Sequence, residues 1–133
     1  MSAGDVLFNR TNSPELVGKS AVFRGHEPVA YAGYLVRLRT NELCDPEYLG
    51  AFLNSARAKA TLRGMAKSIV GMANINAQEV QNMVIPIPPI AEQRSFAEEI
   101  AQVEKLKTIL RDHLAKLDEL FESVQHLAFS DQL

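Results

Sequence analysis

The stretch "IPIPPIAEQR", Ile85 to Arg94, places three prolines within four residues, directly before the longest periodic segment of the chain. Proline lacks a backbone N–H and biases the residue before it toward extended geometry, so this stretch cannot form a helix interior or a central strand. From Ala91, apolar residues recur at helical spacing almost to the end of the sequence. The stretch therefore divides the chain, and we expect a head over residues 1–90 and a long helix over residues 91–133.

The helical segment follows a heptad pattern. With Ile100 as position a, nine of the ten a and d residues between Phe96 and Ala128 are apolar. One helix over residues 91–128 would be roughly 55 Å long, too long for the head to cover, so its apolar stripe needs a partner. We expect a second helix of the same kind, paired parallel or antiparallel. The predicted interface residues are Phe96, Ile100, Val103, Lys107, Leu110, Leu114, Leu117, Phe121 and Val124.

Lys107 is the one polar residue among the ten core positions of this pattern. A buried amine can fix the register or the oligomeric state of a coiled coil. The side chain can equally extend to the edge of the seam and keep its charge in water. The sequence leaves both interpretations open.

The first forty residues contain three short runs typical of strands: Val6 to Asn9, Ser20 to Phe23 and Tyr34 to Arg39. They predict a small antiparallel sheet, with the polar segment of residues 9–19 as a loop. In the third run, Arg37 and Arg39 alternate with apolar residues. They form either a basic stripe or a face that keeps the strand soluble.

Helical signals follow the predicted sheet. Asp45 is an expected N-cap with Pro46 at the first helical position, and this helix is predicted to end near Gly64. Residues 67–76 are predicted to be a loop from their composition. Asn76 and Glu79 then have the spacing of a capping box at the start of a short helix.

Composition and charge limit the classes of function. No apolar run approaches the ~20 residues of a membrane span, and we identify neither a signal peptide nor a transit peptide. The single cysteine, Cys44, excludes an internal disulfide and favours a reducing cytoplasm. Residues 1–90 carry nine Lys or Arg against seven Asp or Glu, and residues 91–133 carry five against nine. This asymmetry permits a head that meets phosphates and a helix that meets protein.

Signatures of catalysis are not found. The sequence has no Walker motif, no G-x-G-x-x-G and no G-x-S-x-G. The Asn-Pro-Pro-Tyr pattern of amino-methyltransferases is also missing. His26, His113 and His126 have no metal-ligand spacing, so neither a metal nor another cofactor is expected.

Several stretches occur in an order that resembles the DNA-specificity subunits of type I restriction-modification systems. They are "GDVLFNRTNSPELVGKSAVF" (4–23), "YLVRLR" (34–39), "PEYLGAFLNS" (46–55) and "NINAQEVQNMVIPIPPIAEQ" (74–93), followed by the long helix. The resemblance implies a non-catalytic subunit of a system in which two target-recognition domains each read half of a split DNA site. Two long antiparallel helices hold these domains apart, and methyltransferase subunits, with restriction subunits through them, are positioned on the site.

This sequence departs from that pattern in two ways. It holds one recognition domain and one spacer helix, so a homodimer would restore the second half. Three residues precede "GDVLF" where the family has many more, so we expect only the latter portion of a recognition domain.

Six residues are candidates for DNA contact, because Arg, Lys and Asn offer charge-assisted or bidentate hydrogen bonds to phosphates and base edges. They are Arg10, Thr11, Asn12, Ser13, Lys19 and Lys67. An ordinary solvated turn is the alternative interpretation for each. Arg57, Lys59 and Arg63 are interpreted as the polar face of their helix.

The prediction is an α+β protein with a small β-rich head of the target-recognition type, short helices and one long C-terminal coiled-coil helix. Its predicted function is that of a cytoplasmic, non-catalytic DNA-specificity subunit that binds double-stranded DNA, a methyltransferase subunit and a second copy of itself. The alternative is a truncated relative that serves as a dimerisation and protein-interaction module and reads no DNA.

Overall fold

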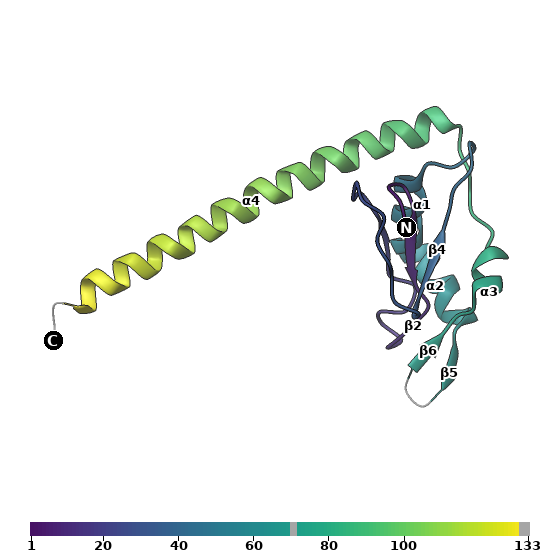
Figure 1. Cartoon of the computed structure of the whole chain (residues 1–133), viewed down its shortest axis with the longest axis horizontal. Helices are drawn as coiled ribbons and strands as arrows, with labels where there is room; N and C mark the ends of the chain where they lie inside the picture. The colour runs from purple at the N-terminus through teal and green to yellow at the C-terminus, as the bar shows by residue number, and fades with distance from the viewer. Residues whose placement is uncertain (70–71, 131–133) are drawn as a thin grey trace. The chain divides into compact units, whose positions relative to one another are not determined.

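The computed structural model describes residues 1–69 and 72–130, with the backbone alone for 67–69 and 72. The described elements confirm the predicted α+β class, with small antiparallel sheets, short helices and one long C-terminal helix (Figure 1). The chain forms two compact units, Met1–Ala97 and Glu98–Leu133. The first unit therefore includes the opening turns of the long helix.

Strand β1 (Val6–Asn9) is the centre of the first sheet, between β3 (Ser20–Val22) and β4 (Leu35–Leu38). Both neighbours run antiparallel to it, and Val6 lies opposite Val22 on one side and Leu38 on the other. The three strands match the runs predicted from the sequence. Side chains alternate along β1, so Val6 and Phe8 point into the core, where both are fully buried.

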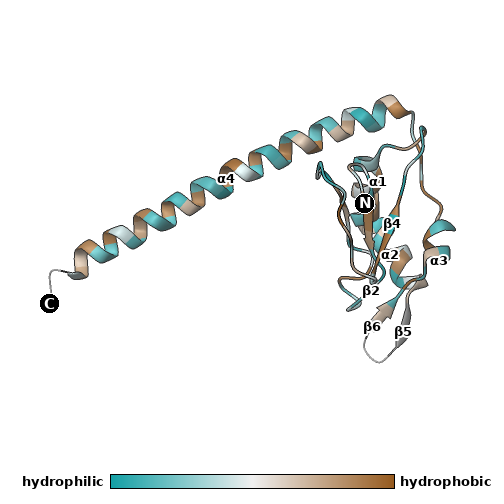
Figure 2. Ribbon diagram, viewed as in Figure 1, coloured by the Kyte–Doolittle hydropathy of each residue, from teal (hydrophilic) through white to brown (hydrophobic). Residues whose placement is uncertain are grey.

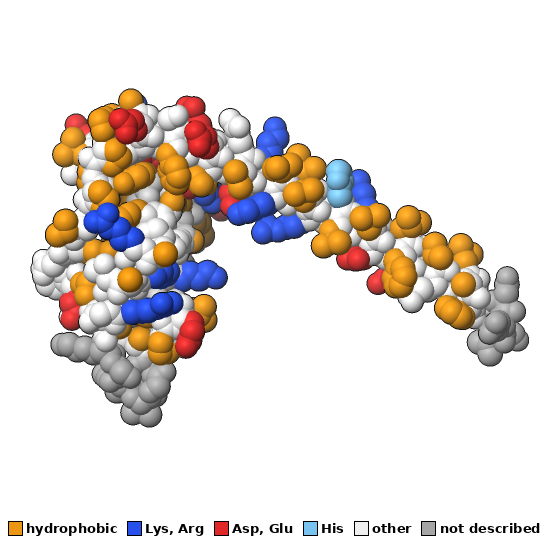
Figure 3. Space-filling view, turned by 180° about the vertical axis from the view of Figure 1, so that it is seen from behind, with side chains coloured by type: hydrophobic (Ala, Val, Ile, Leu, Met, Phe, Trp, Pro, Cys, Tyr) orange, Lys and Arg blue, Asp and Glu red, His pale blue; other side chains and the backbone are white. Residues whose placement is uncertain are grey.

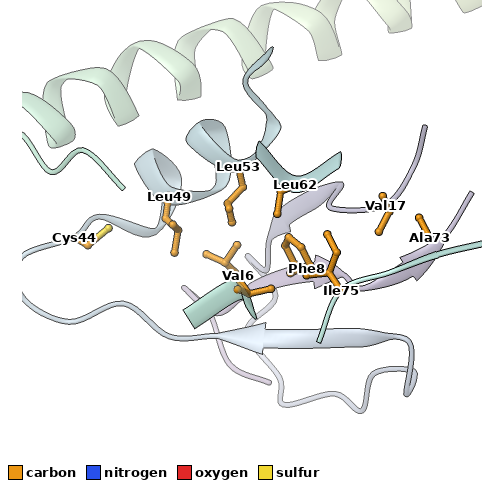
Figure 4. Close-up of a cluster of buried hydrophobic side chains, with 10 residues drawn as sticks. Val6, Phe8, Val17, Cys44, Leu49, Leu53, Leu62, Ala73 and Ile75 are labelled. Atoms are coloured by element: carbon orange, nitrogen blue, oxygen red, sulfur yellow. The ribbon is translucent and has the colours of Figure 1, made fainter. Parts of the chain in front are cut away.

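Helix α1 (Pro46–Asn54) covers this sheet. It begins as predicted, because Asp45 is the N-cap and its carboxylate accepts the backbone N–H groups of Glu47 and Tyr48. Leu49 and Leu53 point from α1 toward Val6 and Phe8 (Figure 4). The buried cluster is Val6, Phe8, Val17, Cys44, Leu49, Leu53, Leu62, Ala73, Ile75 and Val80.

The single helix predicted from Asp45 to Gly64 is wrong. Ser55 has an extended backbone (φ −66°, ψ 155°) and separates α1 from a second helix, α2 (Ala56–Met65). Its hydroxyl accepts the N–H of Ala58 as the N-cap of α2, while Asn54 turns its amide to the backbone of Ser20. The local bond made by the Ser55 hydroxyl competes with the helix ladder, and the longer-range bonds of Asn54 to Ser20 hold the end of α1 against β3.

Two predicted loops contain strands. Residues 67–76 were expected to be a loop but hold β5 (Lys67–Ile69) and β6 (Met72–Asn74), and the polar segment 9–19 holds β2 (Thr11–Asn12). These form a second antiparallel sheet in the order β2, β6, β5. Both loop predictions were wrong. Strand β2 pairs with β6 some sixty residues away, which composition does not reveal, whereas β5 and β6 pair with each other over a few residues of polar and glycine-containing sequence. Val70 and Gly71 lie outside the described residues.

The chain continues through α3 (Ala77–Gln81), which carries the predicted capping box of Asn76 and Glu79. After the proline stretch, α4 (Ile90–Ser130) forms the predicted long helix of 41 residues. Hydrophobic and hydrophilic residues alternate along its length (Figure 2). Almost every side chain of residues 98–130 is exposed, so the second unit by itself leaves the apolar stripe of α4 uncovered.

Candidate nucleic-acid interface

The polar segment from Arg10 to Lys19 is held closed at its base. The N–H of Asn9 donates to the carbonyl of Lys19 at 3.0 Å, and the N–H of Gly18 donates back to the carbonyl of Asn9 at 2.7 Å. Within the segment, the carbonyl of Ser13 accepts the N–H groups of Leu16 and Val17. Gly18 adopts a positive φ of 76°, which a residue with a side chain rarely takes.

Four of the predicted DNA-contact residues, Arg10, Thr11, Asn12 and Ser13, lie in or beside β2. The hydroxyl of Thr11 donates to the side-chain carbonyl of Asn74 at 3.1 Å, and the side-chain carbonyl of Asn12 accepts the N–H of Ser13 at 2.8 Å. The register places Thr11 opposite Asn74, and Asn74 opposite Lys67 on the far strand. Thr11 and Lys67 are far apart in sequence, but in the second sheet both lie opposite Asn74, one on each side of β6. The Lys67 side chain is not described.

Some buried polar atoms in the head have no hydrogen-bond partner. In the described part of the chain, the buried side-chain atoms that lack a hydrogen-bond partner are Asn9 Oδ1, Arg10 Nε and Lys59 Nζ. Asn9 and Arg10 lie at the base of the segment, and Lys59 is close enough to Lys19 for that charge to affect its pKa. Each such atom costs free energy in a native protein, so each is a candidate position for a ligand group that supplies the missing partner.

Lys59 and Arg63 extend the site beyond what the sequence predicted. They lie four residues apart on α2 and therefore share a helix face. Burial lowers the pKa of the Lys59 ammonium, and the charges of Arg63 and Lys19 lower it further. Ion pairs among the described residues do not include Lys19, Lys59 or Arg63. The positive charges of these three residues are therefore not balanced by ion pairs within the described part of the chain.

One carboxylate lies at the edge of this group. The Ser13 side chain is hydrogen-bonded to Glu15 and lowers the pKa of that carboxyl, and the charge of Arg63 contributes to the same effect. Arg63 also lines a hollow of about 260 Å³ together with Pro14, Val17, Ala66 and Ala73. Apart from Arg63, the lining residues are apolar.

The sequence left two interpretations open for Arg37 and Arg39. In the structure, both lie beside the same buried carboxylate, that of Asp5. Asp5 is 4% exposed. Its carboxylate accepts Arg39 Nε at 3.1 Å, and Arg37 Nη1 lies 3.8 Å away. The N–H of Ser2 donates to the same carboxylate at 2.7 Å. Sequence reasoning missed this cluster, because no residue near Asp5 in the sequence distinguishes it from a solvated carboxylate.

The second predicted surface is the apolar stripe of α4. Hydrophobic side chains lie uncovered along this helix in the space-filling view (Figure 3). Leu110, Leu114, Leu117 and Phe121 are each 57–62% exposed, and Val103 and Val124 are about half exposed.

Two predicted interface residues of α4 have partners within their own chain. Phe96 packs edge-to-face on Tyr48, with ring centroids 6.1 Å apart, inside the first unit. Lys107 donates to Glu104 one turn earlier at 2.7 Å, and both side chains are about half exposed.

A search of the described residues (1–69 and 72–130) found no group of three or more His, Cys, Asp or Glu placed to hold a metal ion. Over the same residues, no helix combines the length and the hydropathy of a membrane crossing.

The geometry defines a class of protein: a small α+β unit with cations on a polar segment and on helix α2, joined to a long amphipathic helix whose apolar stripe is exposed. Comparison with known proteins identifies relatives of this kind. The chain is 27% identical over 137 aligned residues to the EcoKI specificity subunit of the type I restriction enzyme of Escherichia coli K12. That alignment covers 98% of this chain and 30% of the relative.

A second relative is the putative MjaX specificity subunit of a type I restriction enzyme of Methanocaldococcus jannaschii. It is 32% identical over 105 residues, which cover 77% of this chain and 25% of the relative. No family model matches the chain. The chain is therefore a relative of type I restriction enzyme specificity subunits, as its motifs predicted, and it spans less than a third of their length.

Proposed function

We propose that this chain is a non-catalytic DNA-specificity module of a type I restriction-modification system. The observation that carries the proposal is the similarity to two specificity subunits, which extends over 98% of the chain in one case. It runs through the head, the proline stretch and α4, so it is not confined to one element that unrelated proteins could share.

The cations beside the Arg10–Lys19 segment support duplex DNA as the ligand. Arg10 and Lys59 carry buried donor atoms without acceptors, and phosphate oxygens are the acceptors that such groups bind most strongly. Thr11, Asn12 and Ser13 would add polar contacts from the same edge, and Lys67 from β5. These residues form the proposed DNA-binding surface.

The uncovered stripe of α4 supports pairing with a second copy. At about 60 Å, a helix of 41 residues is longer than one turn of DNA, which is about 35 Å. A pair of such helices could hold two heads on two half-sites, with methyltransferase and restriction subunits recruited to the assembly. A two-fold homodimer would read the same half-site twice in inverted orientation.

Selection from a pool of random duplexes tests this proposal. The full chain is incubated with the pool at low and at moderate salt, and bound DNA is sequenced over several rounds. An enriched inverted repeat with a fixed gap supports a homodimeric specificity subunit. Binding without any enriched sequence, or no binding at low salt, contradicts it and favours a protein-interaction module.

A further inference from the structure

We propose that Lys59, together with Lys19 and Arg63, forms a binding site for a single phosphate group, and that the phosphate belongs to the DNA backbone. The second part rests on the proposed function. Of these three residues, Lys19 was predicted from the sequence to contact DNA, whereas Lys59 and Arg63 were interpreted there as the polar face of their helix.

The first argument is the state of the Lys59 ammonium. Its Nζ is enclosed and has no hydrogen-bond partner, although an ammonium has three protons to donate. A buried charge without a partner is costly and is usually paired or hydrogen-bonded in native structures. An anion from outside the chain would supply the missing acceptors.

The second argument is the arrangement of the neighbours. Arg63 lies one helical turn beyond Lys59 on the same face of α2, and Lys19 approaches from the segment before β3 closely enough to act on Lys59. A phosphate is attracted by the compact charge of a lysine ammonium and accepts two hydrogen bonds in one plane from an arginine guanidinium. The charges of Arg63 and Lys19, from two parts of the head, thus both act on the Lys59 ammonium.

The remaining surroundings fit an ion held by these side chains alone. Glu15 partly offsets the charge of Arg63, whereas the charges that act on Lys59 are those of Arg63 and Lys19. The hollow beside Arg63 is otherwise lined by Pro14, Val17, Ala66 and Ala73. Its apolar walls do not suit an anion, so we place the phosphate at the three cations and not in the hollow.

The test uses Lys59→Met, which keeps the length of the side chain and removes its charge. Arg57→Met is the matched control, because Arg57 is exposed on the opposite side of the same helix. Binding of a labelled duplex to the full chain is measured by fluorescence anisotropy at several salt concentrations. Loss of one phosphate contact should lower the slope of log K against log salt by about 0.9. Lys59→Met should show this change, and Arg57→Met should bind with the unchanged slope.

Thermal unfolding provides a measurement that does not need DNA. Without added anion, Lys59→Met should unfold a few degrees higher than the unsubstituted chain, because it removes an unpartnered buried charge. Inorganic phosphate should raise the unfolding temperature of the unsubstituted chain more than chloride of equal ionic strength, and should lose this extra effect in Lys59→Met. A lower unfolding temperature for Lys59→Met without anion would overturn the site.

The outcomes separate this inference from the proposed function. If the duplex binds with the same salt slope in Lys59→Met and in the unsubstituted chain, the phosphate site is refuted while DNA binding stands. If no duplex binds, the proposed function and the DNA source of the phosphate both fail. The site itself is then decided by inorganic phosphate: selective stabilisation that requires Lys59 supports it, and its absence overturns it.

Discussion

The side-chain carbonyl of Gln93, in the first turn of α4, accepts the backbone N–H of Asp45 at 2.8 Å. Its amide nitrogen donates to the carbonyls of Leu43 at 2.9 Å and Pro88 at 2.7 Å, and the residue is fully buried. One side chain thus joins the start of α4 to the proline stretch and to the residue that caps α1. This network is how the first turn of α4 becomes part of the head unit.

Replacing Gln93 should therefore cost more than a typical surface change. Gln93→Ala leaves the N–H of Asp45 and two carbonyls without partners, and we expect a loss of about 2–4 kcal/mol in the free energy of unfolding. Gln93→Glu keeps the shape but cannot donate to either carbonyl, so it should also destabilise. Urea unfolding measures both. The control is Gln102→Ala, at an exposed position of the same helix, and a Gln93→Ala effect no larger than this control would contradict the role given to the network.

The Asp5 cluster predicts a dependence of stability on pH. The N–H of Ser2 is the largest cause that lowers the pKa of Asp5 below its ordinary 3.8, with Arg39 and Arg37 adding to it against the effect of burial. The folded state therefore holds the ionised form more strongly than the unfolded chain does. This stabilisation is complete above pH 3.8 and is lost as the pH falls through the lower, folded-state pKa.

Asp5→Asn should remove that contribution. At neutral pH we expect a thermal unfolding midpoint lower by roughly 5 °C, and the gap between the two proteins should narrow as the pH falls from 4 toward 2 in a series of melting curves. Glu27→Gln, at an exposed carboxylate, serves as the control. A gap that stays constant over this range would show that the Asp5 charge does not contribute as argued.

Gly18 is predicted to be intolerant of any side chain. Its φ is +76°, and an added Cβ would lie 2.7 Å from Leu62 Cδ1. Gly18→Ala should thus destabilise the head by roughly 1–3 kcal/mol. Gly33→Ala is the matched control, since nothing lies within 4 Å of its Cβ position. Chemical denaturation of the two variants compares them, and equal stabilities would refute the close approach of this turn to α2.

The sequence predicted those elements whose signals are local. The strand β1, the Asp45 cap, the Asn76–Glu79 capping box and α4 each depend on neighbours within a few residues, and each is present. The break at Ser55 was also signalled locally, by a serine that can cap a helix. It was missed because the apolar period of Leu53, Ala56 and Ala60 continues through it.

The remaining features depend on long-range contacts. Strand β6 pairs with β2 from the other end of the head, and its Gly- and Asn-rich surroundings are typical of a loop. Gln93 falls at an a position of the heptad pattern and Gln102 at a c position, but only the folded head shows which groups enclose Gln93. Lys59 likewise joins the candidate site through Lys19, forty residues earlier. Periodicity can assign a residue to a face, but it does not show what the fold brings against that face.

The stripe of α4 gives the last prediction, which concerns assembly. If two copies pair through it, Leu114→Asp places a charge in the seam and should weaken the dimer at least about 100-fold. Lys107→Leu should strengthen it about tenfold, because an amine at a core position lowers stability. Sedimentation over a range of concentrations measures both. Lys116→Asp and Lys105→Leu make the same kinds of change on the outer face of the helix and should leave the dissociation constant unchanged. A chain that sediments as a monomer at every concentration would exclude self-pairing and leave the stripe to a different partner.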